Sequence, residues 1–308
     1  MKSRYNFVIL GMLAFAFSAG CQDERKETPT KGHITVVTSE SVAPVIELEK
    51  KQFEELYPEA HIELVVSSAR EAITRMFNDT IKVIVSSRPL NAEERDIAKR
   101  TNLTLGEFKI ALDGIAVIVD TTNPVSKLRT TQLDSIFNGT VTHWNSLGVK
   151  NNASIELCVP DRNTGTFEVF ATTILHGKAL ATPSKIVTTS SEMVEFVSTH
   201  PNSIGLLGMN WLNNNKEKIR ALSIADPNAP DSLGSKGEYF TPHPAYVYQH
   251  TYPLTHDVYI YSRTDSYSVG NGFLTFIASA PGQKIILNSG LVPATMPVRL
   301  VQLTNRGQ

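Results

Sequence analysis

One apolar segment limits the folds open to this chain more than any other feature. Residues 110–119 read IALDGIAVIV, and Asp113 is the one charged side chain among them. A strand with apolar side chains on both of its alternating faces is typical of a sheet that helices cover on both sides. The segment therefore predicts a central strand of an α/β protein, and Asn123-Pro124 marks the break after it.

Strand-like and helix-like segments alternate along the rest of the chain. The expected strands are residues 34–37, 62–66, 83–85, 155–159, 204–207 and 258–261. The expected helices are residues 42–56, 93–100, 131–137, 167–175, 191–198, 272–280 and 282–288, with one more that contains Ile73, Met76 and Phe77. This alternation predicts a parallel sheet with helices on both sides. In such sheets ligands bind beyond the carboxyl ends of the strands.

The loops at four of these strand ends are rich in hydroxyl groups. They hold Thr38, Ser39 and Ser41; Ser67 and Ser68; Ser86 and Ser87; and Thr164 and Thr166. The last loop, Asn163-Thr164-Gly165-Thr166, opens a helix, where free N–H groups and the helix dipole attract an anion. Serine and threonine also cap helices for local reasons. Four loops that share the feature favour a site for a tetrahedral oxyanion.

The order of these motifs is specific enough to suggest a family. The segments DGIAVIVDTTNPVSKL, TTQLDSIFNGTVTHWNSLG and RNTGT, with TSESVAP, SSRPL, SIG and SGLVP elsewhere, resemble the phosphate-binding protein of bacterial ABC phosphate transporters. The resemblance covers nearly all of the chain after its first residues, and the divergence falls in the site loops. It implies a two-lobe periplasmic-binding-protein fold of type II. Each lobe is expected to be a mainly parallel sheet flanked by helices, and two crossing segments are expected to join the lobes.

The resemblance also implies how the chain is divided. Residues 32–113 plus 258–308 are expected to form lobe 1, and residues 114–257 to form lobe 2. Two crossings of this kind permit the lobes to close over a ligand by hinge motion.

Ligand positions carried over from the family give a mixed result. The expected binding residues are Ser39, Glu40, Ser41, Ser68, Arg70, Ser86, Ser87, Arg88, Arg162, Asn163, Thr164, Gly165 and Thr166. The last loop matches the family best. The arginine that anchors the anion in the family falls on Pro160, so Arg162 is the expected substitute.

Glu40 departs most from the family pattern, because a hydroxyl is usual there. A carboxylate in a buried anion site disfavours a bound dianion unless a cation offsets it, and Arg70, Arg88 and Arg162 are the available cations. Three interpretations stay open: Glu40 faces solvent as an acid at a helix N-terminus, it accepts a proton from the ligand, or an arginine neutralises it.

The first residues indicate export. Lys2 and Arg4 precede an apolar stretch that is too short for an ordinary membrane span, so residues 1–20 read as a signal peptide. Cys21 follows small residues, as in a bacterial lipobox, and is the expected lipidation site. Ser18 stands where the family has leucine, so an ordinary secreted protein is the alternative. Residues 21–31 read as a lipidated tether.

Other chemistry has little support in the sequence. A net charge of −1 argues against nucleic-acid binding. Cys158 reads as a small buried hydrophobe, and the spacing of His243, His250 and His256 matches no standard metal site. We therefore expect no cofactor, no metal and no enzyme activity, and a monomeric chain.

Three functions follow. The first is a receptor that is lipid-anchored on the periplasmic side of the cell envelope and delivers inorganic phosphate, or a similar oxyanion, to ABC permease subunits. The second is a receptor-like lipoprotein that has lost or changed its ligand and acts as a sensory or partner module. The third, a hydrolase on the same fold, has no nucleophile–base pair to support it.

Overall fold

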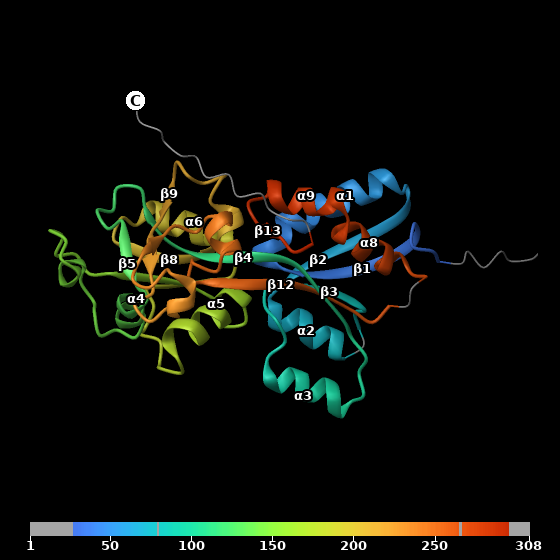
Figure 1. Ribbon diagram of the computed structural model, residues 1–308, viewed down its shortest axis with the longest axis horizontal. Helices are drawn as coiled ribbons and strands as arrows, with labels where there is room; N and C mark the ends of the chain where they lie inside the picture. Colours follow the sequence, from blue (N-terminus) through green and yellow to red (C-terminus); the bar gives the residue numbers. More distant parts are fainter. Residues whose placement is uncertain (1–26, 79, 265–266, 296–308) are drawn as a thin grey trace, which may run out of the picture.

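The computed structural model describes residues 27–78, 80–264 and 267–295. The predicted signal peptide, Cys21 and the end of predicted lobe 1 (residues 296–308) lie outside these ranges. Two lobes lie side by side along the long axis of the molecule, and two long strands run from one to the other (Figure 1). The predicted fold class, an α/β protein of two lobes, is confirmed.

The first lobe, on the right in Figure 1, combines the N-terminal third of the chain with C-terminal helices. Its elements are β1 (Lys31–Ser39), a 3₁₀ turn (Glu40–Val42), α1 (Ala43–Leu56), β2 (Glu59–Ser67), α2 (Ala69–Phe77), β3 (Val83–Ser86), α3 (Ala92–Arg100), α8 (Val269–Ala278), α9 (Ala280–Asn288) and β13 (Val292–Pro293). The strands β2, β1 and β3 pair in parallel in that order. Their carboxyl ends therefore meet at one edge of the sheet.

The second lobe, on the left, is built from the middle of the chain. Its helices are α4 (Thr130–Phe137), α5 (Gly165–Phe170) with a following π-helical turn (Ala171–Leu175), α6 (Ser190–Thr199) and α7 (Pro244–Tyr248), and its strands are β5 (Lys127–Arg129), β6 (Glu156–Pro160), β7 (Lys185–Val187), β8 (Ser203–Gly208), β9 (Ile219–Ala221), β10 (Ser223–Ala225) and β11 (Tyr239–Phe240). Here β8, β6 and β7 pair in parallel. The carboxyl ends of these strands face the first lobe's sheet edge across the interlobe cleft, where residues from both edges line one cavity.

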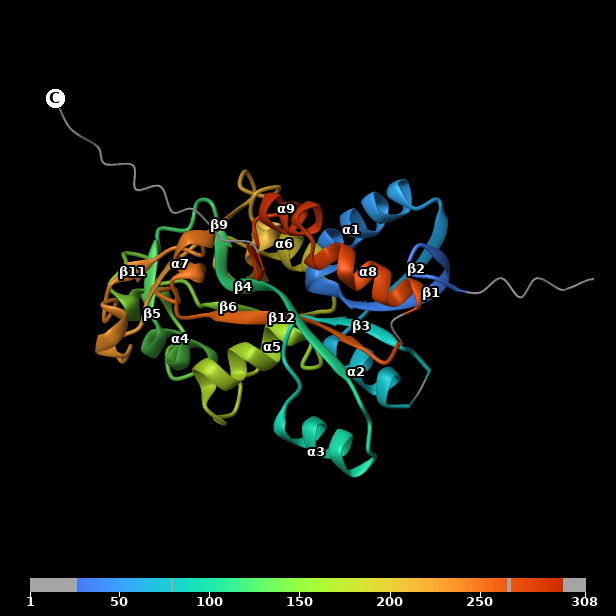
Figure 2. The same ribbon diagram turned by 45° about the vertical axis from the view of Figure 1, so that its right-hand side comes forward.

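The crossing strands are β4 (Gly106–Asp120) and β12 (Thr255–Ser262). The first part of β4 pairs with β12, and its second part pairs with β8 and β9, so that one ten-stranded sheet passes through both lobes (Figure 2). The prediction of a strand buried on both faces is confirmed, because β4 is buried from Ile110 onward. The strands that pair with β4 are antiparallel to it, however, which the apolar pattern did not indicate. Both faces of β4 are buried because helices of the two lobes cover them.

The C-terminal helices pack on the first lobe. The ring centroids of Phe273 and Phe276 in α8 lie 5.4 and 5.6 Å from the ring centroid of Phe53 in α1. α9 also contacts α1, and α8 contacts β1. These contacts agree with a first lobe made of two separate stretches of chain, while the exact division at residues 113/114 and 257/258 stays a prediction.

Part of the predicted tether also contacts this lobe. The Glu27 carboxylate accepts a hydrogen bond from the N–H of Val269 at 2.9 Å, at the start of α8. Pro29 lies so close to Gly272 that a Cβ there would come 1.8 Å from the Pro29 carbonyl oxygen. Glu27 and Pro29 therefore pack on α8, and β1 begins at Lys31, earlier than the strand predicted from residue 34.

Candidate functional site

A small cavity lies between the lobes, where the carboxyl ends of strands from both sheets face each other. It is lined by Ser39, Glu40, Ser41, Ser68, Ala69, Ser87, Pro160, Thr164, Gly165, Thr166, Val187, Thr188, Thr189, Ser190, Met193, Leu206 and Leu207. The space open to the centre of a water molecule inside it is about 20 Å³, somewhat more than the roughly 10–15 Å³ that one water needs. Space of this size excludes a large organic molecule from the cavity in this arrangement of the lobes.

The first lobe contributes hydroxyl groups from the ends of β1 and β3. Ser39 ends β1, and its Oγ accepts a hydrogen bond from the N–H of Ser87 at 3.1 Å. The Oγ of Ser87 is fully buried and has no hydrogen-bond partner in the described part of the chain. A buried hydroxyl without a partner is costly, so Ser87 Oγ is a donor available to a bound ligand.

The second lobe contributes the start of α5. Thr164 caps this helix: its Oγ1 donates to the carbonyl of Asp161 at 2.7 Å and accepts from the N–H of Phe167 at 3.2 Å. Gly165 and Thr166 are the first two residues of the helix, so their N–H groups have no intrahelical acceptor. These N–H groups and the buried Thr166 side chain lie at the cavity, where the sequence led us to expect a bound anion.

The lobes approach closely at Gly165. A Cβ at this position would lie 2.2 Å from Ser87 Oγ and 3.1 Å from the Ser87 carbonyl oxygen. A side chain at Gly165 would therefore displace the Ser87 hydroxyl and press on the Ser87 backbone, so glycine favours this close approach of α5 to the end of β3.

Glu40 crosses the cleft to the start of α6. Its carboxylate accepts hydrogen bonds from the N–H of Ser190 at 2.8 Å and from the Ser190 hydroxyl at 2.9 Å. Burial raises the pKa of Glu40, the two hydrogen bonds from Ser190 oppose this effect, and the nearby Glu192 carboxylate adds to it. The carboxylate therefore occupies the anion-binding end of α6, a place that none of the three interpretations open at the sequence level had considered.

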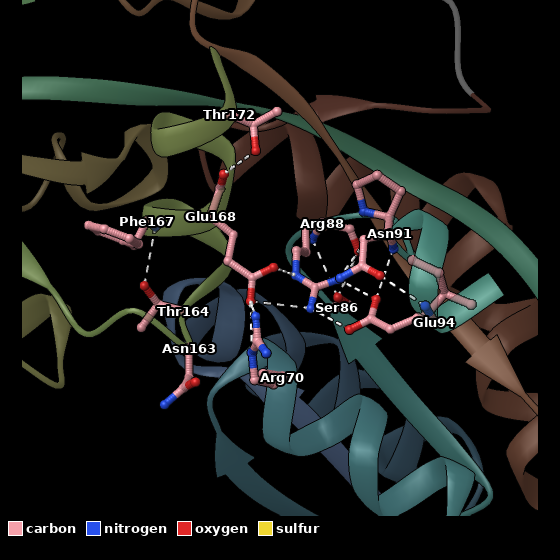
Figure 3. A network of polar contacts seen from close by, with 12 residues as sticks. Arg70, Ser86, Arg88, Asn91, Glu94, Asn163, Thr164, Phe167, Glu168 and Thr172 are labelled. Carbon is pink, nitrogen blue, oxygen red and sulfur yellow. Dashed lines mark hydrogen bonds and ion pairs between the residues drawn. The ribbon is translucent and has the colours of Figure 1, made fainter. Parts of the chain in front are cut away.

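The two arginines nearest the cleft form a network outside the cavity (Figure 3). The Arg88 side chain is 4% exposed, and it donates to both carboxylate oxygens of Glu94 at 2.7 Å. Its Nε also lies 2.7 Å from the carboxylate of Glu168, which belongs to the other lobe. Arg70 reaches the same Glu168 carboxylate at 3.1 Å. Burial alone would raise the pKa of Glu94, but its hydrogen bond with Arg88 holds that pKa below the usual value. Both arginines are thus engaged by carboxylates.

The predicted binding residues divide into two groups. Those that line the cavity are Ser39, Glu40, Ser41, Ser68, Ser87, Thr164, Gly165 and Thr166, and those that lie outside it are Arg70, Ser86, Arg88, Arg162 and Asn163. The Ser86 hydroxyl donates instead to the carbonyl of Arg88 at 2.7 Å. Arg162 is exposed. The one charged side chain that lines the cavity within the described ranges is Glu40.

The loop after β7 was missed by the sequence analysis. Thr188, Thr189 and Ser190 follow this three-residue strand, and Thr189 caps α6 by accepting a hydrogen bond from the N–H of Glu192 at 3.2 Å. The signal was available in the run Thr188-Thr189-Ser190-Ser191-Glu192, because hydroxyls followed by a glutamate mark a helix start. The short, partly exposed strand before it gave no reason to place the run at a sheet edge.

Several other predicted features have plain structural surroundings. Cys158 is a buried free cysteine, and burial raises the pKa of its thiol to about 12. Among the described residues, no three His, Cys, Asp or Glu side chains are arranged to hold a metal ion. The helices within those ranges are also all too short or too polar to span a bilayer.

Comparison with known proteins places this geometry in a family. Residues 23–281 match the PBP superfamily domain. The protein SphX of Synechococcus elongatus is 26% identical over 270 residues, which cover 84% of this chain and 77% of that protein. The phosphate-binding protein PstS of Staphylococcus aureus is 25% identical over 233 residues, covering 75% and 68% of the two chains.

Solved structures share the fold. A protein from Clostridium perfringens, crystallised with bound phosphate, superimposes with a TM-score of 0.73 at 24% identity and covers 85% of this chain and 99% of its own. An ABC-type phosphate transport receptor from Vibrio cholerae gives a TM-score of 0.66 at 22% identity, covering 86% and 100%. The family match over most of the chain is consistent with the two-lobe fold and the interlobe cavity. The chain therefore belongs to the PBP superfamily and is related to its phosphate-binding members.

Proposed function

We propose that this protein binds inorganic phosphate, or a closely similar oxyanion, between its two lobes and delivers it to an ABC permease. The observation that carries the proposal is the interlobe cavity, into which Ser87 presents a buried hydroxyl without a partner while α5 presents two free N–H groups. Each donor to a charged ligand contributes roughly 1.5–3 kcal/mol. The names of the relatives, phosphate-binding protein and phosphate transport receptor, support the same ligand.

The proposal includes a place for the protein in the cell. The signal-peptide pattern and Cys21 support attachment by a lipid on the periplasmic side of a membrane, with the two lobes outside the bilayer. The relatives are named as binding and transport proteins. Their names support the proposal that this protein is a receptor and catalyses no reaction.

A second candidate has one specific observation in its favour. Glu40 brings a carboxylate to the cavity, while Arg70 and Arg88 are both held by Glu168. A carboxylate without a neighbouring cation weakens the binding of a dianion. The same fold therefore also suits a receptor-like lipoprotein whose ligand has changed or been lost, acting as a sensory or partner module.

Calorimetry separates the two functions. The purified chain lacking its signal peptide is titrated with phosphate, sulfate, molybdate and an organic phosphate. Stoichiometric phosphate binding in the micromolar range or tighter supports the receptor, and reduced phosphate uptake by cells that lack the protein supports delivery to a permease. No binding of any oxyanion at millimolar concentration contradicts the proposal and favours the second candidate.

A further inference from the structure

Glu40 lines the cavity and reaches across it to the start of α6. Its carboxylate lies at the N-terminus of α6, a helix of ten residues. It accepts a hydrogen bond from the first N–H group of this helix, that of Ser190, at 2.8 Å. The Ser190 hydroxyl donates to the second carboxylate oxygen at 2.9 Å. This is the hydrogen-bonding pattern by which a helix start binds a free carboxylate or phosphate.

The cavity thus has two anion-binding ends in one space. The α5 end offers the N–H groups of Gly165 and Thr166, with the unpartnered Ser87 hydroxyl beside it. The α6 end is already filled by a carboxylate that the other lobe supplies. The space that remains, about 20 Å³, is little more than one water molecule needs.

We propose that Glu40 is a specificity-determining residue, a tethered anion that fills the α6 end and restricts the ligand to a single oxyanion group. This inference rests on the proposed function, since it assigns which oxyanions the same cavity accepts. A ligand that carries its own carboxylate next to a phosphonate or phosphate group is excluded because its carboxylate and that of Glu40 compete for the same donors on Ser190.

The chemistry suggests a direct probe. Replacement of Glu40 by serine removes a methylene and a carboxylate from the α6 end. Phosphonoacetate carries the same two groups, a methylene and a carboxylate, next to its phosphonate. With Glu40→Ser, the phosphonate is expected at the α5 end and the ligand's carboxylate on Ser190, in the place of the missing side chain.

The experiment compares Glu40→Ser with Glu40→Gln in the purified chain, using phosphonoacetate and inorganic phosphate as titrants. Glutamine keeps the volume of the side chain and removes its charge, so it continues to fill the α6 end. We expect phosphonoacetate to bind Glu40→Ser at least about tenfold tighter than the parent, and Glu40→Gln to show no such gain. Glu47→Ser, on an exposed part of α1 and outside the cavity, is the matched control and is expected to behave as the parent.

Two results would overturn the inference. One is an unchanged affinity of Glu40→Ser for phosphonoacetate, with a melting curve that shows a folded protein. The other is an equal gain in Glu40→Ser and Glu40→Gln. That result would mean that the charge of Glu40 excludes phosphonoacetate, and that the space its side chain fills at the α6 end does not. Should the serine variant not fold, Glu40→Asp, which draws the carboxylate back by one methylene, is compared with Glu40→Gln in the same way. Phosphate titration of the parent tests the proposed function separately, because its failure leaves the phosphonoacetate comparison intact.

Discussion

Thr166 is the residue whose side chain should report most directly on the site. It is buried at the start of α5, and its side chain lines the cavity. Loss of one hydrogen bond to a charged ligand costs roughly 1.5–3 kcal/mol, so Thr166→Ala should weaken phosphate binding at least about tenfold. Calorimetry measures the change. Thr172→Ala, on the same helical run but outside the cavity, should leave affinity as it is; unaltered affinity in Thr166→Ala would move the site elsewhere.

Glu49 is a residue whose chemistry concerns stability, away from the cavity. It is fully buried on α1, both of its carboxylate oxygens lack partners among the described residues, and burial raises its pKa to about 9. The folded protein therefore binds a proton that the unfolded chain, with a carboxyl pKa near 4.5, releases. Stability from this group is complete below about pH 4.5 and is lost as the pH rises toward 9.

The expected result is a pH-dependent difference between parent and variant. Glu49→Gln cannot ionise, so its stability relative to the parent should increase by roughly 1–4 kcal/mol between pH 5 and pH 8, because each pH unit contributes at most about 1.4 kcal/mol. Urea unfolding at the two pH values measures this. Glu47→Gln on the exposed face of α1 is the control. A parent whose stability relative to Glu49→Gln is the same at both pH values would show that Glu49 is ionised in the fold.

At the scale of helices and strands, the contacts between the lobes are the decisive feature. The network in Figure 3 joins α5 to the loop after β3 and to α2, because Glu168 receives both Arg88 and Arg70 across the cleft. Arg88 keeps Glu94 as a second partner within its own lobe. Removal of the Glu168 charge therefore weakens closure while the first lobe retains its internal ion pair.

This arrangement predicts that Glu168→Gln opens the molecule. Loss of one partner of a buried ion pair destabilises a protein by several kcal/mol at most. Part of this cost falls on the closed state, which is the state expected to bind phosphate. Phosphate affinity should therefore fall about tenfold, on the order of 1.4 kcal/mol. Solution X-ray scattering should show a larger radius of gyration in the ligand-free variant. Glu71→Gln removes an ion pair with Arg75 inside α2 and should change neither quantity. An unchanged affinity and radius would mean that the network contributes nothing to closure.

At the scale of the whole molecule, the question is how the two lobes are held at the membrane. Glu27 and Pro29 pack against α8, so the described chain begins on the first lobe, away from the cavity. A lipid on Cys21 would therefore attach the molecule through its first lobe, with six residues, 21–26, between the lipid and the packed segment.

Replacement of the cysteine tests this attachment. Cys21→Ala removes the thiol that would carry the lipid, so the protein should leave the membrane fraction or fail to mature. Cell fractionation and metabolic labelling with a fatty acid measure both effects, and Cys158→Ala, which changes the buried cysteine, is the control. A Cys21→Ala protein that stays with the membrane, together with an unlabelled parent, would exclude lipidation.

The sequence by itself determined the features that depend on neighbouring residues. The buried strand at residues 110–119, the alternation of strands and helices, and the helix that follows the 163–166 loop depend on local periodicity and local hydrogen bonds, and the structure shows each of them. Hydroxyl-rich loops at parallel strand ends were sufficient to bring Ser39, Ser68, Ser87 and Thr166 together in the prediction.

Only the tertiary structure decided which charges face the cavity. Glu40 and Ser190 are 150 residues apart, and Glu168 lies 98 and 80 residues from Arg70 and Arg88. These pairs form because the lobes close, and closure depends on the shape of both lobes and on the absence of a side chain at Gly165. No local pattern encodes such a contact: a glutamate at a helix start looks the same whether it faces water or reaches the helix of another lobe. The hydroxyl donors were therefore predictable one loop at a time, whereas the placement of the carboxylate and the arginines required the folded molecule.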